Sequence, residues 1–579
     1  MLQIITEKFF RLGERYVTRH CATLYTNYEA DRGEKIETVV GSLLPSTGLP
    51  SPKTFTCEII EKQEKCIDGR PGIFVATLGD DLMNDFAAVV SCFFNVTCTP
   101  DIDLARRLLS VERHSLGVEA VPSEFVPRMF DKVVRPDAQA AQEFARFVEE
   151  LVGLERKSFA GAMRAIRQFV TGCHRISDDL SLAYTLFVTS LESLAQAFDG
   201  HVATWKDYDQ TKRNKIDSAL ADATEDVRRK VREAVLANEH VAAARRFRDF
   251  VLANIAPTYF RGEAALTERP ITRPDLPIAL RQAYTIRSGY VHTLRELPAT
   301  LAMKGYAETA EVDDNVALTF AGLARLTRHV ILQFVKHGKK VEKEAFEYRL
   351  SLPGIVQVKL ASHYWISNVE GFDYKTARLH LEAFLEQVAA VLLRQKDAKL
   401  TDLRPILAEV ERTVHGLKKP SQRRPMLVLY FLFNHLAPEE ATCDKWQQLI
   451  ERYASDFDEL AVENVIAHLV SGSPMQWNLE EITRLHGEYF QTRHTAAIVS
   501  IGQFWEAALS LHVAEQWRAA GDADRAIELI AFAADAYPSH ASLREFAEAS
   551  TSETLTDAID WKQILLPPKP VQADPAVSS

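Results

Sequence analysis

The segment LSLAYTLFVTSLESLAQAF, residues 180–198, decides the fold class, because its apolar side chains recur at three- and four-residue spacing. That spacing places them on one face of an α-helix. The segment EFARFVEELVGL, residues 143–154, has the same pattern, and strand signals nearly vanish from residue 138 onward. The sequence therefore predicts a mainly α protein.

The stretch from residue 20 to residue 125 has a different pattern. TLYTNYE (23–29) and TFTCEIIE (54–61) alternate polar and apolar side chains, GIFVATL (72–78) is a short apolar run, and turn-forming segments separate them. These features predict β-strands. LMNDFAAVVSCFF (82–94) has a helical pattern instead. We expect a small α+β or β-rich domain here.

A chain of 579 residues exceeds what one hydrophobic core usually organises, so two to four domains are expected. The patterns predict an N-terminal sensing or regulatory domain over 1–135 and a helical domain over 136–345. A second helical domain is predicted over 346–562, followed by a disordered tail over 563–579 that has few apolar residues.

The composition favours a cytoplasmic protein. The longest apolar candidate, MLVLYFLFNHLA (426–437), is too short to cross a bilayer and contains Asn434 and His435, so it is predicted to be a buried helix. The first residues carry charges where a secretory signal needs an apolar run. Seven cysteines without a CxxC pair fit neither a disulfide framework nor a zinc site. We expect reduced thiols and no membrane association.

One segment carries residues suited to chemistry. IALRQAYTIRSGYVHTLREL, residues 278–297, follows a proline-rich stretch and is predicted to be a helix. In it, Arg287 and His292 are separated by four residues. Histidine can transfer a proton near neutral pH, and arginine offers a planar fork that matches two phosphate oxygens.

The motif IRSGYVH resembles that of the HEPN superfamily, in its Apea-like branch. Upstream, DDLSLAYTLFVTSLESLAQAF with its Leu191–Glu192 pair resembles the opening helix of that branch, and DNVALTFAGLARLTRHVILQFV (314–335) resembles its closing helix. The resemblance covers roughly residues 175 to 340. It implies a metal-independent endoribonuclease whose catalytic residues are Arg287 and His292, with no cofactor.

The resemblance also implies a homodimer or a higher even oligomer. Side chains five residues apart on a helix point about 140° from each other, so one helix does not direct Arg287 and His292 to the same phosphate. In HEPN proteins resembling this one, two motif helices pair to form a shared cleft. We expect auxiliary roles for Ser288, Tyr290 and Glu192; the alternatives are an exposed serine, a packing role for the tyrosine and no catalytic role for the glutamate.

RNA contact needs local basic patches, because the net charge of the chain is −11. Two basic clusters lie inside the HEPN-like region and are the predicted RNA-binding residues: Arg228, Arg229, Lys230 and Arg232, and Arg245, Arg246 and Arg248. Solvated helix faces also explain such runs. Histidines with carboxylate or cysteine partners at ligand spacing are lacking, so no metal is expected.

Residues 507–540, AALSLHVAEQWRAAGDADRAIELIAFAADAYPSH, resemble one tetratricopeptide repeat. Gly521 and Asp522 form the expected turn, while Ala526 and Ala533 permit close helix packing. This resemblance implies that the C-terminal helices bind a protein partner.

The sequence therefore leaves two alternative functions open. The first is a ribonuclease, with the role of a bacterial defence effector that family analogy implies. The second is a non-catalytic scaffold, in which the HEPN-like helices dimerise and the C-terminal helices recruit other proteins.

Overall fold

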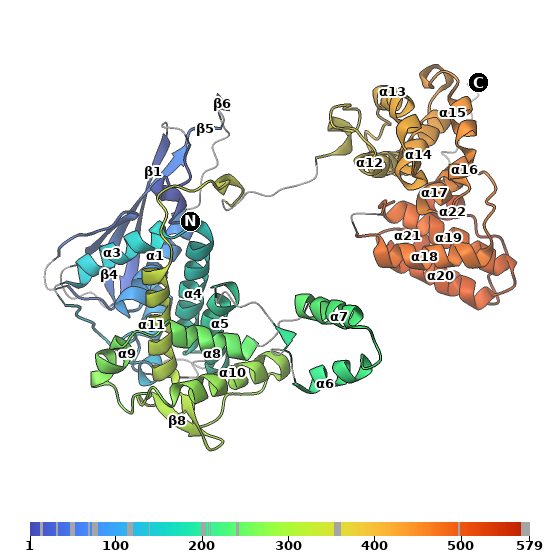
Figure 1. Cartoon of the computed structure of the whole chain (residues 1–579). Coiled ribbons are helices and arrows are strands. Elements are labelled where there is room, and N and C mark those ends of the chain that lie inside the picture. Colours follow the sequence, from blue (N-terminus) through green and yellow to red (C-terminus); the bar gives the residue numbers. More distant parts are fainter. Residues whose placement is uncertain are drawn as a thin grey trace, which may run out of the picture. The chain divides into compact units, whose positions relative to one another are not determined.

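The computed structural model describes residues 1–568, apart from 12–14, 31–32, 47–51, 68–69, 72–78, 113–119, 138, 199–203, 206–207, 209, 239–242, 352–359 and 496–497. The chain divides into two compact units, Met1–Val356 and Gln357–Ser579 (Figure 1). The described residues are mainly helical, with a small antiparallel sheet near the N-terminus, as predicted. The predicted domains 1–135 and 136–345 both fall within the first unit.

The sheet of the first unit has five strands in the order β2-β3-β4-β1-β7. β1 and β4 pair along their whole length, from Arg15 opposite Glu64 to Thr26 opposite Lys53. The predicted strand TFTCEIIE lies in β4, and TLYTNYE begins in β1; the run GIFVATL lies outside the described residues. The bounds are β1 (Arg15–Thr26), β2 (Ile36–Glu37), β3 (Gly41–Pro45), β4 (Lys53–Glu64), β7 (Cys98–Thr99) and, in a separate short hairpin, β5 (Cys66–Ile67) and β6 (Arg70–Pro71).

Helix α1 (Gly79–Phe94) packs on this sheet (Figure 1). Along β4 the buried Phe55 and Ile59 alternate with the exposed Thr56 and Ile60, as expected for a strand with one face toward the core. The side chains that α1 contributes to the same core include Leu82, Phe86, Val89 and Val90. The helical pattern of residues 82–94 is confirmed.

Helices α2 to α5 and α8 to α11 share this core, which runs from Leu2 to Val335. The strands therefore have no core separate from that of the helices. The other helices of the first unit are α2 (Ile102–Leu108), α3 (Ala140–Gly153), α4 (Arg156–Arg175), α5 (Leu180–Phe198), α6 (Gln210–Ala219), α7 (Glu225–Asn238), α8 (Ala243–Ala253), α9 (Thr258–Arg261), α10 (Leu276–Thr293) and α11 (Phe320–His337).

Helix α5 is the centre of the helical part, because it packs against α4, α8, α10 and α11. Its approach to α4 depends on a missing side chain: a Cβ at Gly161 would lie 2.4 Å from the ring of Phe198. A buried hydrogen bond of 2.9 Å from Ser190 Oγ to Ala165 O joins the same two helices. The position of α5 fixes Glu192 inside the unit.

A short hairpin interrupts the helices where we expect almost no strand. β8 (Thr309–Val312) pairs with β9 (Asn315–Leu318). The turn residues Asp313 and Asp314 both have positive φ, 49° and 58°, as the tight turns of hairpins require. Strands of four residues are too short to show a clear alternation, which explains why the sequence does not indicate them.

The second unit has its own hydrophobic core. Residues 426–437 lie in α14 and at its end, and Met426, Leu427, Leu429 and Tyr430 are buried, as predicted for this segment. The bounds are α12 (Ala377–Leu392), α13 (Arg404–Thr413), α14 (Pro420–Leu436), α15 (Trp446–Arg452), α16 (Ala454–Phe457), α17 (Val462–Ser471), α18 (Leu479–Thr492), α19 (Gln503–Ala519), α20 (Ala523–Ala536), α21 (Ala541–Ala549) and α22 (Trp561–Leu565).

Helices α19 and α20 form the helical hairpin expected for residues 507–540. Gly521 in the turn has φ of +88°, which favours glycine, and Ala526 and Ala533 are fully buried between helices. Residues 563–565, which the sequence assigns to the disordered tail, end helix α22, because Leu565 is buried in the core. Within the described chain, no helix is long and apolar enough to cross a membrane.

Candidate active site

Helix α10 carries the Arg287–His292 motif. Pro277 occupies the first turn, where its missing N–H costs no hydrogen bond, and Leu294 ends the helix in a left-handed conformation with φ of 51°. Ala279, Leu280 and Ala283 are buried, and the helix packs on α5, α8 and β9. One face of the motif helix is thereby fixed against the core.

Arg287 lies on that inner side and forms an ion pair with Glu192 of α5. The side chains are only 16% and 5% exposed, respectively. The Glu192 carboxylate also accepts hydrogen bonds from Tyr284 Oη at 3.2 Å and from Gln196 Nε2 at 3.3 Å. The pKa of the Tyr284 hydroxyl is raised, mainly because the group is buried and to a lesser extent because the Glu192 carboxylate lies beside it. Glu192 therefore holds the guanidinium in a nearly dry environment.

The guanidinium of Arg287 is not fully satisfied by these contacts. Its Nε is buried and has no hydrogen-bond acceptor among the described residues. Its Cζ atom lies 5.7 Å from the centre of the Tyr284 ring, which adds a cation–π contact. A buried N–H without an acceptor is costly, so an incoming anion that reached it would gain a strong hydrogen bond.

His292 lies on the last turn of α10 and is exposed. Its imidazole has no hydrogen bond or ion pair with any residue that the structure describes. Because Arg287 points to α5 while His292 points to solvent, the structure of one chain does not bring the two predicted catalytic side chains together. This agrees with the angle of about 140° that five helical residues produce.

The auxiliary residues have different surroundings. The Tyr290 hydroxyl lies 3.5 Å from Asp179 Oδ2, and burial, followed by this carboxylate, raises the pKa of Tyr290. Ser288 is half-buried, and its hydroxyl forms no hydrogen bond with the described part of the chain. Tyr290 therefore ties the motif helix to the start of α5, whereas Ser288 has no comparable anchor.

The first predicted RNA-binding cluster lies on α7. Arg228 donates to the carbonyl of Leu220 at 3.0 Å, and Arg229 and Lys230 pair with Asp226 at 2.7 Å each. Arg232 pairs with Asp217 of α6 at 2.8 Å. These contacts are largely exposed and therefore weak, so they do not prevent the side chains from exchanging partners.

The second cluster, on α8, is closer to the motif. Arg246 Nη2 donates to Gln196 O of α5 at 3.2 Å, and the Gln196 side chain in turn bonds Glu192. Arg248 pairs with Asp249 at 2.8 Å, and Arg245 lies 4.0 Å from the same residue. Through Gln196, Arg246 is thus linked to the Arg287–Glu192 pair.

Three residues of this site were not predicted from the sequence: Tyr284, Gln196 and Asp179. Tyr284 precedes Arg287 by one helical turn, and Gln196 follows Glu192 by one turn, so helical spacing alone could have indicated both.

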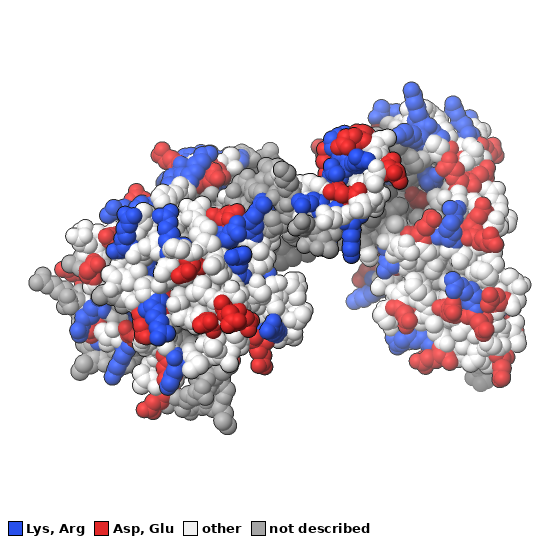
Figure 2. Space-filling view, turned by 60° about the horizontal axis from the view of Figure 1, so that its bottom comes forward, with Lys and Arg blue, Asp and Glu red and all other residues white. Residues whose placement is uncertain are grey.

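On the face in Figure 2, Lys and Arg side chains lie among Asp and Glu side chains. Within the described chain, no group of three His, Cys, Asp or Glu side chains could hold a metal ion.

Comparison with known proteins adds no assignment to this geometry. No family model, curated protein or solved structure matches the chain.

Proposed function

We propose that the protein is a metal-independent endoribonuclease of HEPN type. The observation that carries the proposal is the arrangement on α10, where Arg287 is held by a buried carboxylate and His292 is exposed on the last turn of the same helix. The resemblance of residues 175–340 to the Apea-like HEPN branch supports it. Glu192 is a positioning residue in this proposal.

The chemistry needs few groups, because RNA supplies its own nucleophile, the 2′-hydroxyl. His292 transfers a proton to or from a reacting oxygen, and Arg287 stabilises negative charge on the phosphate. The Nε–H of Arg287, which lacks an acceptor in the described chain, gains one when a phosphate oxygen approaches. No metal or cofactor takes part in this reaction.

A second copy of the chain completes the proposed site. The end of α10 and the segment after it expose four apolar side chains: Val291, Leu294, Met303 and Tyr306. Exposed apolar patches commonly mark interaction surfaces. Pairing of two α10 helices through Val291 and Leu294, at the end of the helix, would allow His292 of one copy to meet a phosphate near Arg287 of the other.

The remaining parts have supporting roles in the proposal. The helices of the second unit bind a protein partner, in line with the α19–α20 hairpin and its resemblance to a tetratricopeptide repeat. The sheet-bearing part of the first unit shares a core with the helices, so a signal received there can alter the site. The biological setting is the cytoplasm of a bacterium under phage attack, by family analogy alone.

One observation favours a second function, a non-catalytic scaffold. The charge of Arg287 is already compensated by Glu192, as expected for a pair that only stabilises the helix packing. In this case α10 serves dimerisation, and the second unit recruits other proteins.

Expression in a bacterial host distinguishes the two functions. A ribonuclease should slow growth and degrade cellular RNA when the wild type is expressed, while His292→Ala at the same protein level should be tolerated. His292 is exposed and without a partner in the described chain, so this substitution should not affect folding. Equal growth for both proteins together with intact RNA would favour the scaffold.

A further inference from the structure

A cavity of about 410 Å³ lies outside the α10 motif, between the region of α9 and the loop that leads into α10. Its lining includes Phe260, Pro270 and Ile271, which offer apolar surface, and the two arginines Arg261 and Arg273. The volume falls at the lower end of the range of small-molecule sites, roughly 300–1,000 Å³. One nucleotide unit is of a suitable size for it.

The two arginines of this cavity are unpaired within the described part of the chain. Arg261 and Arg273 are exposed, and neither guanidinium forms a hydrogen bond or an ion pair with any residue described by the structure. The arginines of α7 differ in this respect, since Arg229 and Arg232 are paired with carboxylates. The cavity therefore presents two positive charges whose donors are available to an anion.

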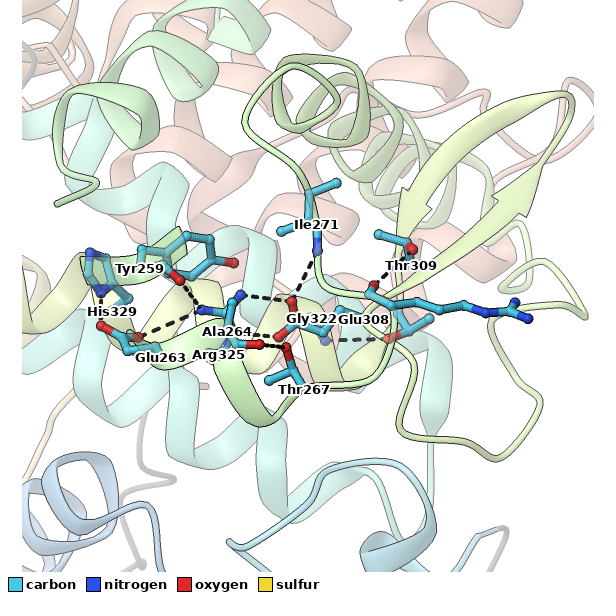
Figure 3. Close-up of polar contacts among 12 residues, drawn as sticks. Tyr259, Glu263, Ala264, Thr267, Ile271, Glu308, Thr309, Gly322, Arg325 and His329 are labelled. Atoms are coloured by element: carbon cyan, nitrogen blue, oxygen red, sulfur yellow. Dashed lines mark hydrogen bonds and ion pairs between the residues drawn. The ribbon is translucent and has the colours of Figure 1, made fainter. Parts of the chain in front are cut away.

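The walls of the cavity are held by one buried ion pair, Arg325 with Glu308 (Figure 3). Arg325 Nη1 donates to Tyr259 O at 2.9 Å, which fixes α9. The backbone N–H of Ile271 donates to Glu308 Oε2 at 3.2 Å, which fixes the opposite wall. Because both walls are bound to the same pair, they are in place before a ligand arrives, which reduces the entropic cost of binding.

A second contact strengthens the wall formed by α9. His329 of α11 is hydrogen-bonded through Nδ1 to Glu263 Oε1 at 2.7 Å (Figure 3). Its Nε2 accepts the backbone N–H of Ala256 at 3.1 Å. The Tyr259 ring contacts the His329 ring, with the two ring centres 5.0 Å apart, and the Arg325 Cζ atom lies 3.8 Å from the centre of the Tyr259 ring. Both ends of the segment from 256 to 263 are thereby attached to α11.

The chemistry of the lining indicates the ligand. Two guanidinium groups match the charge of a phosphomonoester, about −1.5 to −2 at neutral pH, better than the single charge of a carboxylate or a phosphodiester. Phe260 and the neighbouring apolar side chains suit a planar ring such as a nucleobase. We propose that this cavity binds the phosphomonoester of a nucleotide, and that its occupant in the cell is the 5′-phosphorylated end of an RNA strand.

The choice of an RNA 5′ end as the occupant of the cavity rests on the proposed function. Cleavage by the 2′-hydroxyl leaves a 5′-hydroxyl on the downstream fragment, whereas the upstream fragment keeps the original 5′-phosphate. A site selective for the phosphomonoester would therefore retain the upstream fragment and release the downstream one.

Isothermal titration calorimetry on the full chain tests the inference without relying on cleavage. The probes are AMP, adenosine, and a DNA hexanucleotide with or without a 5′-phosphate, which has no 2′-hydroxyl and so resists the proposed reaction. We expect the phosphorylated probes to bind at least about tenfold more tightly than their unphosphorylated counterparts. Binding of AMP alone would identify a free nucleotide as the occupant, and binding of the hexanucleotide alone would identify a strand end.

Two variants and a matched control locate the site. Arg261→Gln and Arg273→Gln should each weaken binding of the phosphorylated probe by about tenfold. Arg269→Gln removes an exposed arginine from the same loop that does not line the cavity, and it should bind as the wild type does. The inference is overturned if neither phosphorylated probe binds, if the phosphate makes no difference, or if all three variants bind equally. Because binding is measured apart from cleavage, these outcomes do not depend on whether the protein is a nuclease.

Discussion

The buried pair of Arg287 and Glu192 allows a quantitative test of the site. Glu192→Leu removes the carboxylate and leaves a guanidinium that is only 16% exposed. Removal of one partner of a buried pair typically costs about 3–5 kcal/mol, and we expect the lower end because Arg287 keeps some contact with water. Arg287→Met should cost about as much, since Glu192 must then be buried without a cation.

The double variant Glu192→Leu/Arg287→Met is the decisive member of this set. Replacing both charges with apolar side chains of similar size is often neutral, so the double variant should be more stable than either single one. The resulting coupling free energy should be at least about 2 kcal/mol, a value typical of residues in direct contact.

Scanning calorimetry of the full chain measures these effects as shifts in Tm. An unfolding entropy of about 2.1 cal/mol/K per residue gives about 0.75 kcal/mol/K for a unit of this size, so a loss of about 3 kcal/mol lowers Tm by about 4 °C. Asp226→Asn breaks exposed pairs on α7 and should leave Tm unchanged. If Glu192→Leu behaves like this control, or if the two single effects simply add in the double variant, the buried pair does not exist in solution.

Three further predictions concern other parts of the fold. Gly322→Ala should lower the stability of the first unit by about 1–3 kcal/mol, because a Cβ at this position would lie 2.4 Å from Glu308 O. A Cβ at Gly289 would make only ordinary contacts, 3.7 Å from the Arg295 side chain, so Gly289→Ala should not lower Tm in calorimetry. Burial lowers the pKa of His486 from 6.5 to about 4, so the unfolded chain binds the proton first as pH falls. The free energy of unfolding of the second unit should then drop by up to about 3 kcal/mol between pH 6.5 and 4, and His486→Gln should weaken this pH dependence. Tryptophan fluorescence should report unfolding of this unit, since six of the seven tryptophans lie in it. A pH dependence that His486→Gln leaves unchanged would contradict the lowered pKa of His486. Leu294→Glu should halve the mass of the dimer in light scattering, and a wild type that is already monomeric at micromolar concentration would contradict pairing through α10.

Local patterns in the sequence predict much of the helical structure. The apolar spacing in residues 180–198 matches helix α5, with bounds of Leu180–Phe198, and the run from Met426 is a buried helix. These features are predictable because helical periodicity is local and each segment has enough turns to show it.

Features that depend on distant contacts were not predictable in the same way. No pattern in the sequence indicates that the sheet and the helices share one core, because that packing joins residues from Leu2 to Val335. The contact between Glu192 and Arg287 joins two helices that are far apart in sequence, and only the family resemblance drew attention to Glu192. The cavity with Arg261 and Arg273 was missed because its walls meet through Arg325 and Glu308, which lie outside that loop.

Analysis of RNA cleavage products examines the chemistry proposed for Arg287 and His292. Purified wild type incubated with single-stranded RNA in EDTA should produce fragments that end in a 2′,3′-cyclic phosphate or a 3′-phosphate and begin with a 5′-hydroxyl, while DNA of the same sequence stays intact. His292→Ala should lower the rate by about 10²–10⁴-fold, the usual contribution of a general acid or base. Fragments that begin with a 5′-phosphate, a requirement for Mg²⁺, or full activity of His292→Ala would show that Arg287 and His292 do not cleave RNA in this way.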